Sequence, residues 1–413
     1  MKINKQIKDI LLDRLLFSLG ILLLIRIGTF LPVPGINHSD LAFYIERHSV
    51  AKNVISTFSG SNTFVIGVFT LNIFPYINAT IFVQLLLGFS PKLAKLQKEG
   101  DLSGRRSITR LTRVITLGWA IIQSAGVALY LRQVLFDWNW ILAAEIILWL
   151  TTGAMIVLWL SELITDYGLG NGTSLLVYTN IVSNLPNLFQ KLVVENTDNF
   201  TLSSIVIVSI LILSSLYGIV FLQTGIRKIP LISSKQLNQF SSQEGIQSYL
   251  PLRLNQAGVM PIILTTACLV LPNYLINLGI FPWLNFLSSF KFLYWIGYVS
   301  LILVFSSFYS SIVLKPKDIS DQLQKMAVTI PGIRPGLQTI FYLKRVINRI
   351  TLIGAIILAI IVVVPNFIES TLNITALSNL STTSLLILAG VVLDLLREID
   401  NIYYSNVYNN QYE

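Results

Sequence analysis

The segment between Gly67 and Phe89 constrains the fold more than any other, because it combines the hydrophobicity of a membrane helix with polar side chains and a proline. It reads GVFTLNIFPYINATIFVQLLLGF and contains Asn72, Pro75, Asn78, Thr80 and Gln84. In hydrocarbon every backbone and amide group needs a partner, so such a segment survives only where protein covers it or where it borders a wet cavity. The segment therefore indicates a pathway through a membrane.

The composition places most of the chain in that membrane. Of the 413 residues, 54% are hydrophobic and 12% are charged, and the mean hydropathy is +0.70. This profile excludes an ordinary soluble globular protein. We predict ten spans of the length that a bilayer requires, at 14–32, 74–90, 112–132, 140–160, 170–190, 202–224, 256–276, 292–314, 346–368 and 381–398. No small-residue cleavage site precedes the first span, so insertion by an internal signal is expected.

The distribution of Lys and Arg predicts the orientation. Of the 29 basic residues, 23 lie in the N-terminal segment, the 92–113 and 227–253 segments, the 315–349 segment and the C-terminal tail. The positive-inside rule then puts both termini on the cytosolic or stromal side. We therefore attribute the net charge of +9 mainly to basic residues that set the orientation in the membrane. The alternative is that the basic loops contact ribosomal RNA.

Ten spans divide into five and five, and an odd number per half inverts the second half relative to the first. In such proteins, interrupted helices at corresponding positions mark the functional centre. The second span is predicted to be interrupted at Pro75, and its counterpart, the seventh, carries Gly258 and Pro261 in its first turn. The alternative is that Pro and Gly are simply common in membrane helices.

Motifs along nearly the whole chain resemble those of one known family. They are LIRIGTFLPVPGIN (24–37), FPYINATIFVQLL (74–86), KEGDLSGRRSITRLTR (98–113), GLGNGTSLLVY (168–178), YLPLRLNQAGVMP (249–261), IPGIRPG (330–336) and TSLLILAGVVLD (383–394). In this order they resemble the SecY family, the channel subunits of the Sec protein translocase. The resemblance implies an all-α membrane protein of ten transmembrane helices in two inverted five-helix halves around a central hourglass pore. The halves would be 1–190 and 202–413, joined by a hinge loop at 191–201, with cytosolic loops at about 225–255 and 315–349.

The resemblance also implies a function and a pore constriction. Such a channel passes unfolded polypeptides across the membrane and releases hydrophobic helices sideways into lipid between helices 2 and 7. Ile73, Ile77 and Ile81 recur every four residues and share one helix face. The apolar pore ring is expected to consist of Ile73, Ile77, Val177, Ile263 and Ile387, with Thr173 near it. A collar of branched apolar side chains resists wetting and blocks ions. The alternative is that these residues are core or lipid-facing aliphatics.

Two further parts of the channel are expected beside the ring. The lateral gate would use Thr80, Ile81 and Gln84 of helix 2 with Gln256, Thr265 and Thr266 of helix 7. Hydrogen bonds between these helices would be worth roughly 1 kcal/mol each, and bonds to their own backbone are the alternative. A plug half-helix is expected at about 56–72, beginning near Phe58, Ser59 and Gly60; a plain connecting loop is the alternative.

The cytosolic loops are expected to dock partners. Arg334 lies in a rigid PGIRPG turn that would present its guanidinium, with a solvated surface arginine as the alternative. The other candidate docking residues are Arg227, Lys228, Arg105 and Arg106. The partners that the resemblance implies are a SecE-like small membrane subunit, a SecG-like subunit, a SecA-type ATPase, the ribosome, preproteins with signal sequences, and membrane lipid.

The sequence offers little that would support an enzyme. His38 and His48 are the only histidines, lie ten residues apart and have no cysteine nearby, so we expect neither a metal site nor a cofactor. No phosphate-binding GxxxxGK[ST] loop occurs. The rival functions are a secondary transporter of inverted-repeat type and a divergent SecY paralogue with restricted substrates. The Ile-, Leu- and Asn-rich composition favours a plastid-encoded protein of the thylakoid membrane, with a bacterial plasma membrane as the alternative.

Overall fold

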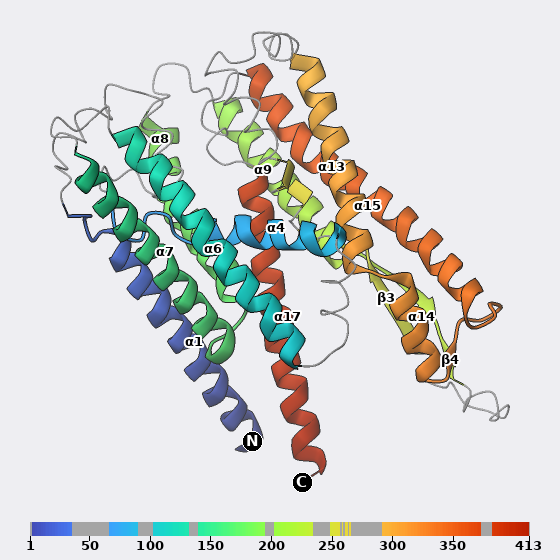
Figure 1. The fold of residues 1–413 in the computed structure, drawn as a ribbon. Helices are drawn as coiled ribbons and strands as arrows, with labels where there is room; N and C mark the ends of the chain where they lie inside the picture. The colour runs from blue at the N-terminus through green and yellow to red at the C-terminus, as the bar shows by residue number, and fades with distance from the viewer. Residues whose placement is uncertain are drawn as a thin grey trace. The chain divides into compact units, whose positions relative to one another are not determined.

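The computed structural model of the chain consists mainly of long helices, with short strands in two of the connecting segments (Figure 1). It describes residues 2–34, 66–89, 102–131, 139–194, 202–233, 248–256, 258, 261–262, 264–265, 291–372 and 382–412. The helices are α1 (Lys2–Thr29), α4 (Phe74–Phe89), α6 (Leu102–Leu131), α7 (Trp140–Tyr167), α8 (Gly172–Val194), α9 (Leu202–Thr224), α13 (Lys291–Val313), α14 (Pro316–Lys325), α15 (Leu337–Leu372) and α17 (Thr382–Tyr412). The strands are β1 (Ile226–Pro230), β2 (Ile232–Ser233), β3 (Tyr249–Arg253) and β4 (Val328–Thr329).

Every predicted span except 256–276 falls on one of these helices, and 256–276 lies largely outside the described residues. Several helices are longer than predicted: α6 begins at Leu102, α15 begins at Leu337 and α17 ends at Tyr412. Hydropathy marks only the part of a helix that lies in lipid, whereas a polar extension continues the same hydrogen-bond ladder into water.

Two of the predicted connecting segments contain regular secondary structure. Arg105 and Arg106 lie in the first turns of α6, not in a loop between helices. The segment 315–349 contains α14, β4 and the start of α15. The predicted interruption of the second span at Pro75 is also absent, because α4 begins at Phe74 and continues through Pro75. Pro75 is the second residue of α4, where the missing N–H of proline costs nothing.

The surface of the helices is that of a membrane protein. Within the described residues, four helical stretches are long and apolar enough to cross a membrane, and two shorter ones are also apolar. These are Arg106–Leu129, Trp140–Tyr167, Trp295–Lys325 and Leu337–Pro365, with the shorter Phe74–Leu87 and Ile210–Thr224. In α7, Ile146 and Leu150 are buried while Leu148 and Trp159 are 67% and 58% exposed. A helix that is apolar on all sides is stable where its surroundings are apolar too.

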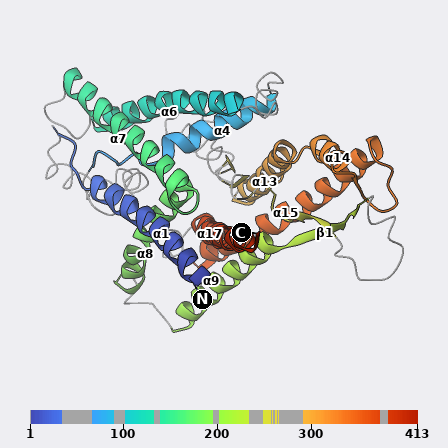
Figure 2. The ribbon, with the colours of Figure 1, turned by 90° about the horizontal axis from the view of Figure 1, so that it is seen from below.

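The chain divides into two compact units, which are residues 1–195 with 391–413, and residues 196–390. In the first unit α7 packs against α1, α6 and α8, and α4 packs against α6 (Figure 2). In the second unit α15 packs against α9, α13 and α14. The assignment of 1–190 and 202–413 as inverted halves with a hinge at 191–201 stays a prediction.

The core of the first unit lies between α6, α7 and the turn that precedes α4. It contains Val33, Ile66, Leu71, Ala120, Ala128, Ile146, Leu150 and Ala154. The alanines let the backbones come close, as small residues do in membrane helix packing. The hydroxyl groups of Ser124 and Thr151 lie 3.3 Å apart and join α6 to α7.

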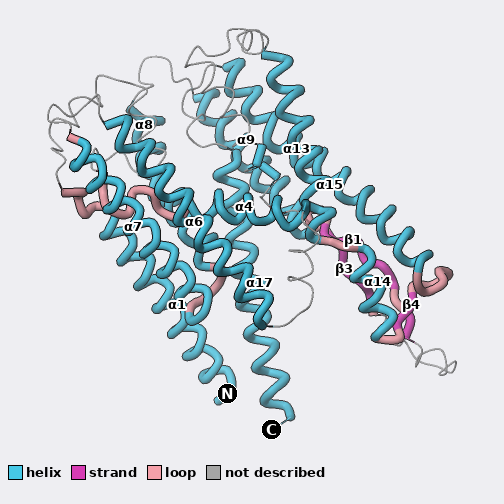
Figure 3. Tube along the Cα trace, viewed as in Figure 1, coloured by secondary structure: helices cyan, strands magenta, loops and turns pink. Residues whose placement is uncertain are grey.

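The core of the second unit lies at one end of α15, beside the strands (Figure 3). It contains Ile229, Leu252, Ile330, Leu343, Val346, Ile347 and Ile350. Strand β1 pairs with β3 in antiparallel register, from Ile226 opposite Arg253 to Pro230 opposite Tyr249. Strand β2 pairs with β4, which joins the segment after α9 to the segment after α14. The hydroxyl groups of Ser310 and Thr351 lie 2.7 Å apart and join α13 to α15.

Candidate functional site

The turn before α4 is the most specialised piece of backbone in the first unit. Its start pairs with the segment that follows α1, because the Val33 N–H donates to the Ile66 carbonyl at 3.1 Å. At its end Asn72 has a φ of 47°, a left-handed conformation that asparagine tolerates better than most residues. The Asn72 Oδ1 accepts the N–H of Ile73 at 2.8 Å. The asparagine therefore both makes the sharp turn and satisfies a backbone donor beside the first turn of α4.

Three glycines allow this turn to pack directly on its neighbours. A Cβ at Gly67 would run into the Thr29 carbonyl, and a Cβ at Gly153 of α7 would run into the Val68 carbonyl. A Cβ at Gly28 would overlap the Phe69 ring. Because the first two contacts are with backbone, no side-chain rotation relieves them. The position of α4 is thus fixed by backbone packing against α1 and α7.

The predicted ring and gate residues of α4 follow from this turn. Ile73 is 2% exposed, Ile81 is 8% exposed, and Ile77, Thr80 and Gln84 are half-buried. The Ile77 N–H donates to the Ile73 carbonyl at 3.1 Å, which continues the helical ladder back to Ile73. The Thr80 hydroxyl donates to the Ile77 carbonyl at 2.8 Å. Its hydrogen is therefore bonded within α4.

The first turn of α8 carries the other predicted ring residues of this unit. Asn171 precedes the helix, and its Oδ1 accepts the Thr173 N–H at 3.1 Å and the Thr173 hydroxyl at 2.8 Å. This is the side-chain cap that asparagine supplies at helix starts. Thr173 and Val177 are both half-buried and lie one turn apart. The Thr173 hydroxyl hydrogen is thus bonded to the side chain that caps α8.

The GLGNG motif before α8 is a tight corner between helices, and two of its three glycines are required by the local packing. Gly170 has a φ of +83°, which side chains rarely adopt, and a Cβ there would meet Leu395 of α17. A Cβ at Gly172 would run into the Ser161 carbonyl of α7. The Ser18 hydroxyl of α1 accepts the Leu169 N–H at 2.9 Å. The motif therefore fixes α8 to α1, α7 and α17.

The remaining predicted residues lie on the second unit or outside the described residues. Ile387 of α17 and Gln256 are half-buried. Thr265 is fully buried, and its hydroxyl donates to the Pro261 carbonyl at 2.7 Å. Ile263, Thr266 and the predicted plug start at Phe58, Ser59 and Gly60 lie outside the described residues. Ile73, Ile77, Thr173 and Val177 belong to one unit and Ile387 to the other, so a single closed ring stays a prediction.

The predicted docking residues are held on folded elements. Arg227 and Lys228 are exposed on β1, and the Lys228 Nζ lies 4.8 Å from the centre of the Tyr249 ring. Arg334 is exposed, and its carbonyl accepts the Thr339 hydroxyl at 3.0 Å. Gly332 and Gly336 on either side have φ values of 75° and 100°. These left-handed residues build the turn that presents Arg334. On α6, Arg106 is exposed.

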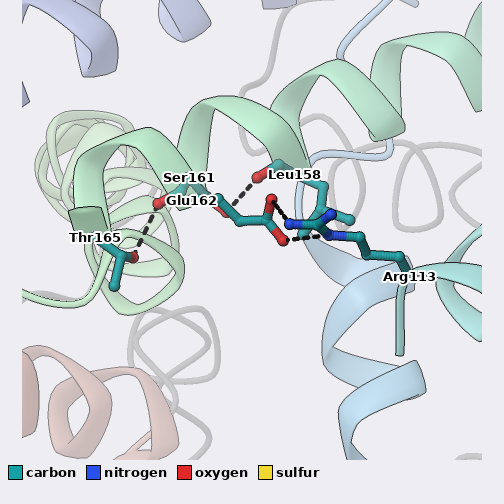
Figure 4. Close-up of polar contacts among 5 residues, drawn as sticks. All are labelled: Arg113, Leu158, Ser161, Glu162 and Thr165. Atoms are coloured by element: carbon teal, nitrogen blue, oxygen red, sulfur yellow. Dashed lines mark hydrogen bonds and ion pairs between the residues drawn. The ribbon is translucent and has the colours of Figure 1, made fainter. Parts of the chain in front are cut away.

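Sequence reasoning missed an ion pair between α6 and α7. The Nε and one Nη of Arg113 donate to the two carboxylate oxygens of Glu162 at 3.0 and 2.8 Å (Figure 4). Tyr76 of α4 lies near enough to interact electrostatically with both groups. The two side chains are 51% and 28% exposed, so the pair is worth at most about 1 kcal/mol. Its two-pronged geometry orients α6 on α7 beside α4. The only sequence signal was the presence of two charges within apolar helices, because residues 49 positions apart share no helical periodicity.

Comparisons with known proteins agree with the motif resemblance. The family model described as SecY matches residues 67–396. The "Protein translocase subunit SecY" of Trieres chinensis is 58% identical, over 98% of this chain and 99% of the relative. That of Guillardia theta is 43% identical over 98% and 99%, and that of Synechococcus elongatus is 40% identical over 96% and 93%.

Solved structures show the same fold at low sequence identity. The structure titled "The structure of a protein conducting channel" has a TM-score of 0.63 at 17% identity, over 96% of this chain and 93% of that one. Sec61 in a canine ribosome-channel complex has a TM-score of 0.60 at 15% identity, over the same shares. The family match over most of the length confirms the resemblance found in the motifs, and the chain belongs to the SecY family.

Proposed function

We propose that this chain is the protein-conducting channel of a membrane translocon, which passes unfolded polypeptides across the membrane and releases hydrophobic helices sideways into lipid. The observation that carries this proposal is the SecY match over nearly the whole chain. The relatives named above are protein translocase subunits, so a secondary transporter of inverted-repeat type is not favoured. A divergent paralogue with restricted substrates is the remaining alternative.

The constriction is proposed to be an apolar collar of Ile73, Ile77, Val177, Ile263 and Ile387, with Thr173 beside it. In support, Ile77, Val177 and Ile387 are half-buried aliphatic side chains, which suits residues that border a narrow passage. A collar of this kind expels water when it is empty and fits closely around an extended chain when it is open.

The lateral gate is proposed to lie between α4 and the predicted seventh span, 256–276. The hydroxyl hydrogens of Thr80 and Thr265 are bonded within their own helices, so cross-gate donors would come from Gln84 and Gln256, and Ile81 and Thr266 would add packing. Few cross-gate hydrogen bonds, each worth about 1 kcal/mol, keep the closed gate easy to open. A signal helix that enters the open gate then replaces the apolar contact between the two gate helices with apolar contacts of its own.

Photocrosslinking tests this function directly. A photoreactive phenylalanine analogue at Ile77, Val177 or Ile387 is expected to crosslink to a preprotein that is arrested during translocation. The matched control positions are Leu148 and Ile360, which are 67% and 55% exposed on the outside of α7 and α15, and which should crosslink only to lipid. Equal crosslinking of the preprotein at ring and control positions would exclude the proposed passage.

The partners are proposed to be a SecE-like subunit, a SecG-like subunit, a SecA-type ATPase and the ribosome. The structural relative from the canine endoplasmic reticulum lies in a ribosome-channel complex. The exposed Arg227, Lys228 and Arg334 supply basic surface on the second unit, and the exposed Arg106 does so on α6; Arg105 is proposed as a further docking residue. Mass spectrometry of the gently purified complex should find a small single-helix subunit.

We propose the thylakoid membrane as the location, with both termini on the stromal side; relatives from Trieres chinensis and Guillardia theta support this.

Reversing the charge at Arg334 is expected to weaken motor or ribosome binding at least tenfold without unfolding the protein. The guanidinium is exposed, and the turn is built by Gly332, Gly336 and backbone bonds that do not use it. Binding of a SecA-type ATPase to Arg334→Glu in vesicles, measured by cosedimentation, checks this. The matched control is Arg345→Glu, which reverses the charge of an exposed arginine on α15. Equal loss in both variants would show a general charge effect.

A further inference from the structure

Helices α6 and α7 pack closely along one half of their length. The buried residues that they contribute to the core of the first unit are Ala120, Ala128, Ile146, Leu150 and Ala154. These residues fall in the ranges 120–131 of α6 and 140–154 of α7, as does the hydroxyl contact between the two helices. Small residues and short hydroxyl side chains bring backbones close together. These two ranges, here called the packed halves, therefore form a fixed joint.

The two helices diverge toward the start of α6 (Figure 2). Positions 113, 117, 120 and 124 lie on one face of α6, because residues three and four apart are neighbours on a helix. Ser124 and Ala120 are fully buried on this face, whereas Leu117 is 44% exposed and the Arg113 side chain is 51% exposed. The face that packs on α7 in one half of α6 is thus exposed in the other half, 102–119, here called the open half.

The Arg113–Glu162 ion pair bridges this divergence. Glu162 lies in the 155–167 half of α7, and its two carboxylate oxygens accept bonds of 3.0 and 2.8 Å from Arg113 of the open half (Figure 4). Among the described residues this pair joins two helices, whereas the Arg397–Asp394 pair lies within α17. Long, partly exposed side chains therefore hold the open half of α6 on α7.

Helix α4 is attached to α6 and begins beside this pair. It packs against α6, and Tyr76 in its first turn interacts electrostatically with both Arg113 and Glu162. The turn before α4 is fixed to α7 instead, because the Val68 carbonyl lies where a Cβ at Gly153 would be. A movement of the open half away from α7 would therefore carry α4 with it, about this anchored turn.

We propose that Arg113 and Glu162 are positioning residues that brace the closed lateral gate. Opening swings the open half of α6 together with α4, about the packed halves and the turn before α4, and it breaks the ion pair. The pair stabilises the closed state relative to the open one, so its strength helps to set how hydrophobic a segment must be to open the gate. This inference rests on the proposed function, because it takes α4 as one side of the gate.

Insertion of test segments into lipid measures the effect of the pair. The segments are alanine stretches of increasing leucine content within a preprotein, and the measured quantity is the ratio of membrane-inserted to translocated product in proteoliposomes. An exposed ion pair shifts a two-state equilibrium by about twofold to fivefold. Arg113→Gln and Glu162→Gln should each raise the ratio by that factor for a segment of intermediate hydrophobicity. Arg110→Gln, which changes an exposed arginine of α6, should leave the ratio at the wild-type value.

Charge exchange separates pairing from a merely structural role. Arg113→Glu combined with Glu162→Arg restores an ion pair between the same positions and should return the ratio to the wild-type value. Unchanged ratios in both single variants would overturn the proposal. So would a double variant whose ratio is no closer to the wild type than those of the single variants.

Distances between spin labels test the swing independently of conduction. The labels are placed in a chain whose only cysteine, Cys268, is replaced by serine. One pair of exposed positions reports the open half and the other reports the packed halves; they are Val114 with Trp159, and Leu129 with Leu148. In the purified complex, Glu162→Gln should widen the first distance distribution and leave the second unchanged.

The two measurements together distinguish the brace from the proposed function. A first distance that stays the same in Glu162→Gln, or one that widens while the insertion ratio does not change, would overturn the brace. If the first distance widens but the wild-type complex neither translocates nor inserts any preprotein, the proposed function is wrong and the ion pair still holds α6 on α7.

Discussion

Replacing Gly153 with alanine is expected to lower the thermal unfolding midpoint of the complex by about 1–4 °C. The added methyl group would overlap the Val68 carbonyl, and a backbone neighbour cannot move without displacing the turn that carries Asn72. Overpacking of this kind costs about 1–3 kcal/mol. With an unfolding entropy of about 2.1 cal/mol/K per residue, each 1 kcal/mol shifts the midpoint of a chain of 413 residues by about 1 °C. Size-exclusion chromatography after stepwise heating of the detergent-purified complex measures the shift.

Gly126→Ala is the matched control for that prediction. Gly126 also lies within an apolar helix, α6, but a Cβ there would meet nothing within 4 Å. Its midpoint should stay the same or rise slightly, because alanine favours the helix by about 1 kcal/mol over glycine. If the two variants unfold at the same temperature, the close packing of the turn before α4 on α7 is wrong.

Replacing Ile77 and Ile387 together with glycine is expected to raise the chloride leak of proteoliposomes at least tenfold in the absence of substrate. The two substitutions remove branched side chains from the proposed collar, and a wider, less apolar constriction holds water and conducts ions. A chloride-sensitive dye enclosed in the vesicles reports the efflux rate. This prediction depends on the proposed ring.

The control for the leak replaces Leu148 and Ile360 with glycine in the same way. Both side chains are exposed on the outer surfaces of α7 and α15, and two helix-interior glycines cost about 1 kcal/mol each wherever they are placed. The chloride efflux from the control vesicles should stay at the wild-type rate. A leak of equal size in both double variants would mean that helix destabilisation, and not loss of a seal, opens the membrane.

The positions of the helices were predictable from the sequence where an apolar run has sharp polar ends. The predicted span 202–224 coincides with α9, Leu202–Thr224, because TDNF precedes it and a glycine with basic residues follows it. Hydropathy could not give the start of α6 at Leu102 or the end of α17 at Tyr412, since polar helix in water has no hydrophobic signal. The family, and with it the function, followed from motifs spread along the chain.

The geometry of the candidate site was less accessible to sequence reasoning. Asn72 and Pro75 were recognised as unusual, but the left-handed φ of Asn72 and the place of Pro75 at a helix start depend on the packing of the turn against Gly67 and Gly153. The Arg113–Glu162 pair and the pairing of β2 with β4 join residues far apart in sequence. No local pattern specifies such partners, because tertiary packing decides them.

The pairing of β2 with β4 has a mechanical consequence for the second unit. The segment after α9 and the turn of Arg334 share one hydrophobic core with the first turns of α15. If a partner binds at Arg334, the force that it exerts there acts on this rigid core, to which both α9 and α15 are connected. A force on this turn would therefore displace α9 and α15 together, because a shared core and not a flexible linker connects them to it.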